Sequence, residues 1–312
     1  MPFNPEKYIN PYTDFGFKRL FGSEVNKDLL IDFLNELIHE QGEIVDIQYL
    51  TNEQLGRNEF ERRAIFDIYC QNEHGEHFIV EMQRNKQNFF KDRSVYYATF
   101  PIQQQAFTGE WNFDLKAVYF VGILDFVFDK EDAEYCHHEV KLMDIKNKKV
   151  FYDKLTFIYL EMPKFNKSID QLESHFDKWL YVIKNLARLQ DRPVELQERV
   201  FEKLFYEAEI AKFSQIERMS YEGSRKVYWD NYAVYETCIN EGYMEGKEEG
   251  RVEGRAEGIA EGRAEGKIEG ITEGRFEEKI AIAKNMLKKG MSLNDIIEIS
   301  GLTTEEINKL EQ

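Results

Sequence analysis

The stretch FDIYCQNEHGEHFIVEMQ, residues 66–83, decides the fold. Two β-prone runs, RRAIFDIYC and HFIVEMQ, flank the segment QNEHGE, whose Asn72 and Gly75 are typical of a hairpin turn. Successive side chains of a strand point to opposite faces, and each run places polar residues among apolar ones. We therefore predict two antiparallel strands that lie next to each other.

Two carboxylates, Asp67 and Glu81, interrupt these otherwise apolar runs. A carboxylate buried on a central strand is unfavourable unless something neutralises it, and two adjacent carboxylates are more so. A divalent cation such as Mg²⁺ prefers carboxylate and water oxygens, and it can activate water against a phosphodiester. The pattern therefore indicates a metal-dependent nuclease. The spacing alone leaves a second interpretation open, an edge hairpin whose Asp67 and Glu81 point to solvent.

The segments around the hairpin alternate between helix and strand patterns. Residues 26–40 carry apolar side chains at helical spacing, and residues 116–128 form a nearly continuous apolar run, typical of a central strand covered on both faces. Further elements are expected at 44–50 and 155–162 (strands) and at 94–107 (helix). The order of helix, three strands, helix and strand predicts an α/β fold.

Composition divides the chain into four segments. We expect an α/β core at 1–165, a helical extension at 166–238, a glycine and glutamate repeat at 239–278, and a small helical tail at 279–312. The repeat segment differs most from the others in composition, because glycine recurs every fourth residue from Gly242 to Gly274 in the pattern xxEG.

The repeat favours a helix that needs a partner. Each glycine lowers helix stability by about 1 kcal/mol relative to alanine, so the isolated helix is marginal. On a helix the glycines form a bare stripe that winds by about 40° per repeat, with Glu on one flank and Arg or Lys on the other. Opposite flanks would face each other in a parallel pair, so we expect a parallel self-associating helix and a homo-oligomer. A flexible acidic linker is the alternative.

The tail at 279–312 has the pattern of a helix-turn-helix. Ser292 and Thr303 stand at N-cap positions, and Thr303 with Glu306 has the spacing of a capping box. The final helix, TTEEINKLEQ, carries more acid than base, which makes it a poor reader of a major groove. We therefore favour protein contact over DNA contact for the tail.

The formal net charge of -17 opposes long-range attraction to nucleic acid. One local exception is RNKQNFFKDR, directly after the hairpin, which supplies Arg84, Lys86, Lys91 and Arg93. We expect these four residues to bind nucleic acid, and a solvated loop is the alternative.

Other patterns indicate a cytoplasmic protein. No stretch approaches the roughly 18 uninterrupted apolar residues of a membrane span, so no membrane contact is expected. The three cysteines, Cys70, Cys136 and Cys238, share no metal-ligand spacing and suit a reducing compartment. Cys136 precedes His137 and His138, but adjacent histidines on a strand point opposite ways, so an edge strand is expected here rather than a zinc site.

Several motifs together resemble the Rpn family, whose members are called recombination-promoting nucleases or putative transposases. They are D-x-x-F-K-x-L-F at Asp14–Phe21, FLNELI at 33–38, the pair at 66–83, and the following Arg93, Tyr97 and Gln105. The resemblance covers roughly residues 8–300. It implies a PD-(D/E)XK restriction-endonuclease-like core of order αβββαβ, followed by a helical extension and a long helical C-terminal tail. The implied function is a DNA endonuclease linked to recombination, transposition or defence. A catalytically weak scaffold that self-associates through the repeat is the alternative.

The resemblance also implies roles for single residues. Asp67 and Glu81 would coordinate Mg²⁺, with Mn²⁺ or Ca²⁺ as alternatives, helped by the backbone carbonyl of Met82. Gln83 stands where the superfamily has lysine, so it can only donate a neutral hydrogen bond or orient water.

Further residues are expected around these ligands. Arg93 or Lys18 would supply the missing positive charge, and Asp14 and Glu36 are candidate outer carboxylates. Asp14 has a second interpretation as a helix N-cap. Tyr97 and Gln105 follow on the next helix and would face either the substrate or the core.

Overall fold

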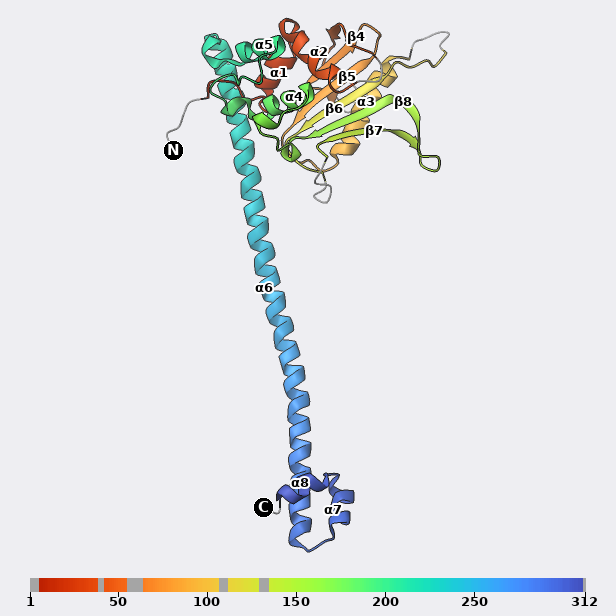
Figure 1. Ribbon diagram of the computed structural model, residues 1–312, viewed down its shortest axis with the longest axis vertical. Coiled ribbons are helices and arrows are strands. Elements are labelled where there is room, and N and C mark those ends of the chain that lie inside the picture. The colour runs from red at the N-terminus through yellow and green to blue at the C-terminus, as the bar shows by residue number, and fades with distance from the viewer. Residues whose placement is uncertain (1–5, 39–41, 55–63, 107–111, 129–134, 311–312) are drawn as a thin grey trace. The chain divides into compact units, whose positions relative to one another are not determined.

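The computed structural model describes residues 6–38, 42–54, 64–106, 112–128 and 135–310. The chain divides into two compact units, Met1–Tyr235 and Glu236–Gln312. The first unit holds a sheet with its covering helices (Figure 1). The second holds the glycine repeat and the last two helices.

The first unit is built on a mixed six-stranded sheet (Figure 1). Its strands are β1 (Ile47–Tyr49), β4 (Ile68–Asn72), β5 (His77–Gln83), β6 (Val118–Leu124), β7 (His137–Asp144) and β8 (Lys149–Glu161). They lie in the order β1-β4-β5-β6-β8-β7. β4 and β5 form the predicted antiparallel hairpin, with Ile68 opposite Val80, while β5, β6 and β8 run parallel.

Helices cover both faces of this sheet, as Figure 1 shows. One face carries α1 (Asp14–Phe21), α2 (Lys27–Asn35), α4 (His175–Asn185) and α5 (Arg199–Ala208), and the other carries α3 (Phe90–Gln104). Every residue of β6 is buried, as predicted for a central strand. The α/β fold class is confirmed, and the order α1, α2, β1, β4, β5, α3, β6 agrees with the αβββαβ core that the resemblance implies.

The run RRAIFDIYC is not one continuous strand, which corrects the sequence-based prediction. Ala64–Ile65 (β3) pairs with Glu53–Gln54 (β2) in a separate two-stranded sheet, and β4 starts only after Asp67. Asn52 explains the break. Its backbone oxygen accepts from Phe66 N at 3.0 Å, and its side-chain Nδ2 donates to Asp67 O at 2.9 Å. These bonds replace the strand pairing that Phe66 and Asp67 would otherwise make.

The boundaries of α3 and β8 also differ from prediction. α3 begins at Phe90 instead of residue 94, because Phe89 adopts a left-handed conformation with φ of 63° and Phe90 is buried under the helix. The predicted end of this helix, Phe107, lies outside the described residues, as do residues 39–40 of the helix predicted at 26–40. β8 extends back to Lys149, and its first residues are exposed although they include the apolar Val150 and Phe151.

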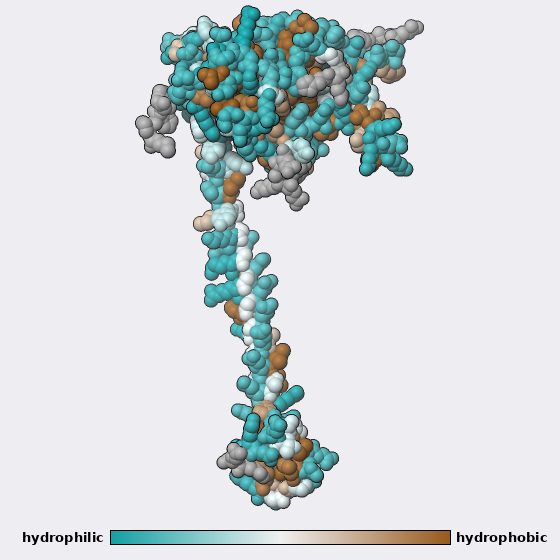
Figure 2. All heavy atoms as spheres, viewed as in Figure 1, coloured by the Kyte–Doolittle hydropathy of each residue, from teal (hydrophilic) through white to brown (hydrophobic). Residues whose placement is uncertain are grey.

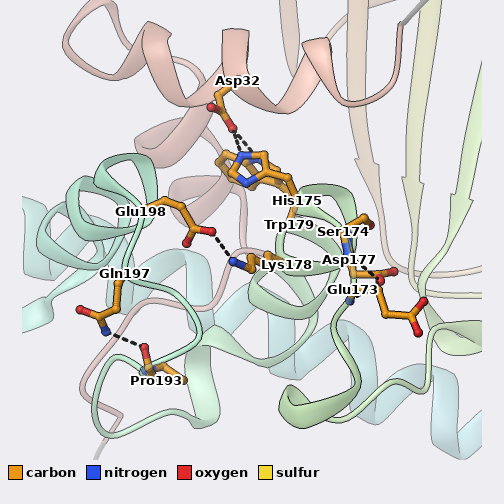
Figure 3. A network of polar contacts seen from close by, with 10 residues as sticks. All are labelled: Asp32, Glu173, Ser174, His175, Asp177, Lys178, Trp179, Pro193, Gln197 and Glu198. Atoms are coloured by element: carbon orange, nitrogen blue, oxygen red, sulfur yellow. Dashed lines mark hydrogen bonds and ion pairs between the residues drawn. The ribbon is translucent and has the colours of Figure 1, made fainter.

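A polar network fastens the helices on the first face (Figure 3). Asp32 on α2 accepts hydrogen bonds from His175 Nε2 at 2.6 Å and Trp179 Nε1 at 2.7 Å, both on α4. Lys178, also on α4, forms an ion pair with Glu198 just before α5. The three helices are thereby joined by charged contacts as well as by their apolar core.

The second unit contains most of α6 (Gln215–Lys288), followed by α7 (Leu293–Ser300) and α8 (Thr304–Leu310). The glycine repeat is helical, and no atom lies within 4 Å of where a Cβ would stand on any glycine from Gly242 to Gly274. Figure 2 shows them as a pale stripe along the helix. The predicted capping box is confirmed, with Thr303 N donating to Glu306 Oε2 at 2.7 Å. Among the helices described, none is long and apolar enough to span a membrane.

Candidate metal centre and active site

Asp67 and Glu81 lie side by side across the β4–β5 hairpin. Met82 N donates to Asp67 Oδ2 at 2.9 Å, and Asp67 N donates to Glu81 Oε1 at 3.1 Å. A backbone N–H of the opposite chain segment therefore holds each carboxylate. Glu81 is 6% exposed, so the interpretation in which it points to solvent is wrong.

The electrostatics of this pair favour a bound cation. Burial first, and the charge of Asp67 second, raise the pKa of Glu81 from 4.5 to about 8. Burial also raises the pKa of Asp67, and the Met82 N–H and the charges of Lys18 and Arg93 offset this only in part. A divalent cation would relieve both the burial of charge and the mutual repulsion.

Arg93, in the first turn of α3, brings positive charge to the pair. Its Nη2 donates to Gln83 Oε1 at 2.8 Å and lies 3.8 Å from Glu81 Oε2. The guanidinium lies over the rings of Phe90 and Tyr97, at 4.8 and 5.6 Å from their centroids. Stacking on aromatic faces restrains an arginine side chain. Tyr97 thus lies beside the site and helps to hold Arg93 against Gln83 and Glu81.

α1 adds a second cation and a third carboxylate. Lys18 lowers the pKa of both paired carboxyls, and Asp14, which forms an ion pair with Lys18 at 2.6 Å, raises the pKa of Asp67. The N-cap of α1 is Thr13, whose side chain accepts from Gly16 N at 3.0 Å. The interpretation of Asp14 as the N-cap is therefore wrong, and Asp14 lies at the border of the site.

Two predicted site residues lie elsewhere. Glu36 follows α2 and is close enough to His175 to raise the pKa of that imidazole. Gln105 follows α3, where its Oε1 accepts from Lys116 N at 2.6 Å and its Nε2 donates to Lys116 O at 3.3 Å. Lys116 precedes β6, at the opposite end of the sheet from Glu81. Gln105 therefore fastens a connection and does not reach the carboxylates.

The basic residues after the hairpin do not line up as one strip. The Arg84 guanidinium lies 3.4 Å from the ring centroid of Tyr228 on α6. Lys86 Nζ donates to Phe128 O at 2.7 Å, and Lys91 Nζ lies 4.7 Å from the Phe128 ring centroid. Of the four predicted cations, Arg93 is the one that contacts the carboxylate pair.

The CHH sequence lies on the edge strand β7, as predicted. The His137 ring packs 5.3 Å from Phe176, whereas His138 Nε2 lies 3.1 Å from Glu161 Oε2, so the two imidazoles have different surroundings. Within the described residues, no three His, Cys, Asp or Glu side chains form a group that could hold a metal ion.

The hairpin pair offers a different donor set, which fits a hard divalent cation. Two carboxylates and a neighbouring backbone carbonyl are the oxygen ligands that Mg²⁺, Mn²⁺ and Ca²⁺ accept, and Mg²⁺ commonly keeps several waters beside only one or two carboxylates. Arg93 and Lys18 lower the pKa of Glu81 but leave it at about 8, and a bound cation would lower it further.

Comparison with known proteins agrees with this geometry. Residues 11–238 match the model of the PD-(D/E)XK nuclease family transposases, and residues 276–312 match the C-terminal HTH domain of the Rpn/YhgA-like nuclease family. The chain belongs to the PD-(D/E)XK nuclease family. No curated protein and no solved structure gives a significant match. The Rpn resemblance is therefore confirmed. The match at 276–312 identifies the tail of this PD-(D/E)XK family member as a helix-turn-helix domain.

Three residues of this PD-(D/E)XK family member were not predicted from the sequence, two beside the candidate site and one at the end of β8. Asn52 sets the break before Asp67, and no local pattern marks it. Gly122 on β6 lies in register with Glu81, and a Cβ there would approach Tyr159 Cδ1 to 3.2 Å. A single glycine within an apolar strand was a signal for this close approach. Glu161 ends β8 as a buried carboxylate, a pattern that resembles that of Glu81 on β5.

Proposed function

We propose that this chain is a divalent-metal-dependent DNA endonuclease that hydrolyses phosphodiester bonds. The observation that carries the proposal is the carboxylate pair of the half-buried Asp67 and the buried Glu81, each of which accepts a backbone hydrogen bond and has a raised pKa. Membership of the PD-(D/E)XK nuclease family supports it. A role in recombination, transposition or defence is part of the proposal, as is a cytoplasmic location.

The proposed roles follow from the contacts. Asp67, Glu81 and the Met82 carbonyl would hold Mg²⁺, Mn²⁺ or Ca²⁺. The chemistry that such a cation supplies is polarisation of a phosphoryl oxygen and activation of water. Arg93 would contact the scissile phosphate, since a planar guanidinium suits two phosphate oxygens at once.

Gln83 takes an indirect part in this proposal. Its carbonyl oxygen accepts from Arg93 at 2.8 Å, and its Nε2 donates to Asn85 O at 3.1 Å. Gln83 would therefore position Arg93, and Lys18 with Asp14 would adjust the charge at the border of the site.

A plasmid assay tests the proposal. Purified protein is incubated with supercoiled DNA and Mg²⁺, Mn²⁺ or Ca²⁺ in turn, beside Asp67→Asn and Glu81→Gln. These substitutions keep the shape of each side chain and remove its negative charge. We therefore expect the native chain to nick the plasmid and each variant to nick it at least about 100-fold more slowly. Glu195→Gln, at an exposed carboxylate outside the site, is the control and should nick as the native chain does. Equal nicking by all four proteins, or none with any metal, would contradict the nuclease.

A second candidate function is assembly through the glycine repeat. The exposed helix presents glycines without neighbours from Gly242 to Gly274, so a second helix could pack closely against them. In this alternative the nuclease-like unit is a scaffold, and the repeat forms a parallel homo-oligomer. The HTH tail would then add a contact to protein or to DNA.

Cys238 provides a direct test of this orientation, since it is exposed while Cys70 is buried. In a parallel pair the two Cys238 thiols lie close together, and mild oxidation should cross-link the copies. A Gly254→Ala, Gly258→Ala, Gly262→Ala variant should be more helical yet associate less, as measured by sedimentation equilibrium. A native chain that stays monomeric at all concentrations would remove the assembly proposal.

A further inference from the structure

A hollow lies on the α3 face of the sheet. It has a volume of about 470 Å³ and is lined by α3, β7, β8 and the segment after β6. This is within the range of about 300–1,000 Å³ found for small-ligand sites. Its walls include the rings of Phe128, Phe157 and Tyr159. We call it the β8 pocket.

The register of the sheet links the β8 pocket to the carboxylate pair. Glu81 lies beside Gly122, Gly122 beside Tyr159, and Tyr159 beside His138, so the four residues form one row across four strands. Neighbouring strands are about 4.8 Å apart, which places Tyr159 roughly 10 Å from Glu81 along this row. Because Gly122 has no side chain, the Tyr159 ring fills the space beside it.

The Phe90 ring lies near residues of both sites. The Arg93 guanidinium lies 4.8 Å from its centroid. The rings of Phe128 and Tyr159 each lie 6.2 Å from it, centroid to centroid. The first turn of α3 therefore contributes Arg93 to the active site and Lys91 to the β8 pocket.

The charge around the β8 pocket is opposite in sign to that of the whole chain. Of the described residues that line it, Lys91, Lys141 and Lys164 are basic and Glu161 is the one carboxylate. Glu161 is 1% exposed and is already bound by Lys164 and by His138 Nε2, the latter at 3.1 Å. Lys164 is thus paired inside the pocket, Lys141 forms an ion pair with Glu139 at 2.7 Å, and Lys91 is exposed on α3. The pocket combines aromatic faces with an exposed lysine at its border.

We propose that the β8 pocket receives an unpaired nucleobase of the DNA strand that is cut at Asp67 and Glu81, an inference that rests on the nuclease function proposed above. Aromatic side chains stack on any base, and neighbouring cations hold the strand. A base that leaves its partner can reach this pocket, because Tyr159 lies roughly 10 Å from Glu81 along the row. The preferred substrate class is therefore single-stranded DNA, or a duplex with an unpaired nucleotide.

Binding in the absence of cleavage tests this proposal separately from the nuclease function. The full chain is titrated in EDTA with a paired duplex and with the same duplex carrying one unpaired 2-aminopurine. We expect quenching of the 2-aminopurine fluorescence and roughly tenfold to hundredfold tighter binding of the second probe. Val95→Trp, which fills the pocket from an exposed position on α3, should abolish both effects and leave duplex binding unchanged.

Two further variants keep the result interpretable. Val150→Trp makes the same change on β8 outside the pocket, and Val150 is 52% exposed against 53% for Val95, so it should retain the preference. Phe128→Leu keeps an apolar wall without an aromatic face and should lose the quenching.

The remaining outcomes would overturn the proposal. If Val95→Trp still binds the duplex with the unpaired 2-aminopurine more tightly than the paired duplex, the base binds outside the β8 pocket. Equal binding of both probes by the native chain, or no binding of either, removes the pocket proposal, whereas the nuclease is decided separately by the plasmid assay with metal. Competition by free deoxyadenosine monophosphate as strong as by the oligonucleotide would assign the pocket to free nucleotides. A change of oligomeric state in Val95→Trp, without a base preference in the native chain, would make it a protein contact.

Discussion

Replacing Glu81 by glutamine should stabilise the metal-free protein at alkaline pH. The folded-state pKa of Glu81 is about 8, against an ordinary value of 4.5. Between these values the folded protein holds a proton that the unfolded chain has lost. The contribution of Glu81 to the free energy of unfolding is therefore fully present below pH 4.5 and is lost as the pH rises towards 8. Glutamine does not ionise, so Glu81→Gln removes this loss.

The magnitude follows from the same two values. Each tenfold change in proton affinity is about 1.36 kcal/mol, so the interval from 4.5 to about 8 amounts to roughly 5 kcal/mol. This is an upper value, because part of it is the repulsion shared with Asp67, whose own pKa burial also raises.

Urea unfolding in EDTA between pH 5 and 9 measures the effect. All tryptophans of the chain lie within Met1–Tyr235, so their fluorescence reports on the unit that contains the site. We expect Glu81→Gln to gain a few kcal/mol over the native chain at pH 9 and much less at pH 5. Divalent metal should stabilise the native chain at pH 9 and the variant far less. Parallel pH profiles for the two proteins would refute the reasoning.

Other predictions follow from neighbouring contacts. Arg93→Gln should lower plasmid nicking by roughly 100-fold, and Gln83→Lys should lower it too by placing an ammonium against Arg93. The double variant Gln83→Lys, Arg93→Gln returns one cation to the site and should nick faster than Arg93→Gln alone; an equal or lower rate would contradict the role of Arg93. The hydrogen bond to Asp32 raises the pKa of His175 above 6.5, so its stabilisation is present below that pH and is lost as the pH rises through the folded-state value. Asp32→Asn should therefore reduce the free energy of unfolding by about 2 kcal/mol at pH 5.5 and less at pH 9, and an equal loss at both would refute this. Leu34 is buried in the core under α2, so Leu34→Ala should lower the free energy of unfolding by about 2–5 kcal/mol at every pH in urea titrations. A loss below about 1 kcal/mol would show that this core is loosely packed.

The sequence predicted those parts of the fold whose apolar pattern is strong. The hairpin at 66–83 and the central strand at 116–128 were both found, because their side chains are buried on one or both faces. β7 and the start of β8 are exposed, so burial does not mark how far these strands extend, although an edge strand was expected at His137 and His138. The break before Asp67 depends on Asn52, a contact between segments that no local pattern reveals.

The two carboxylates of the candidate site could be predicted from the sequence, whereas the contacts of the neighbouring basic residues could not. Asp67 and Glu81 are unusual within apolar runs, and that contrast is visible in one sequence. The partners of Arg84 and Lys86 are a tyrosine ring on α6 and a backbone carbonyl after β6, both distant along the chain. Arg84 and Lys86 were predicted to act with Arg93 because they are close to it in the sequence. In the folded chain they contact other residues.

Because Arg93 comes from a helix and not from a strand of the hairpin, its position beside the carboxylates depends on where that helix begins. A lysine on the strand itself would keep its place relative to the carboxylates whatever follows it. Arg93 instead reaches Gln83 across a connection of only a few residues that ends at the left-handed Phe89. One residue inserted within α3 just after Arg93 would turn the first turn of the helix by about 100° relative to the rest, and carry the guanidinium away from the carboxylates. The spacing between Arg93 and the part of α3 that packs on the sheet should therefore tolerate no insertion.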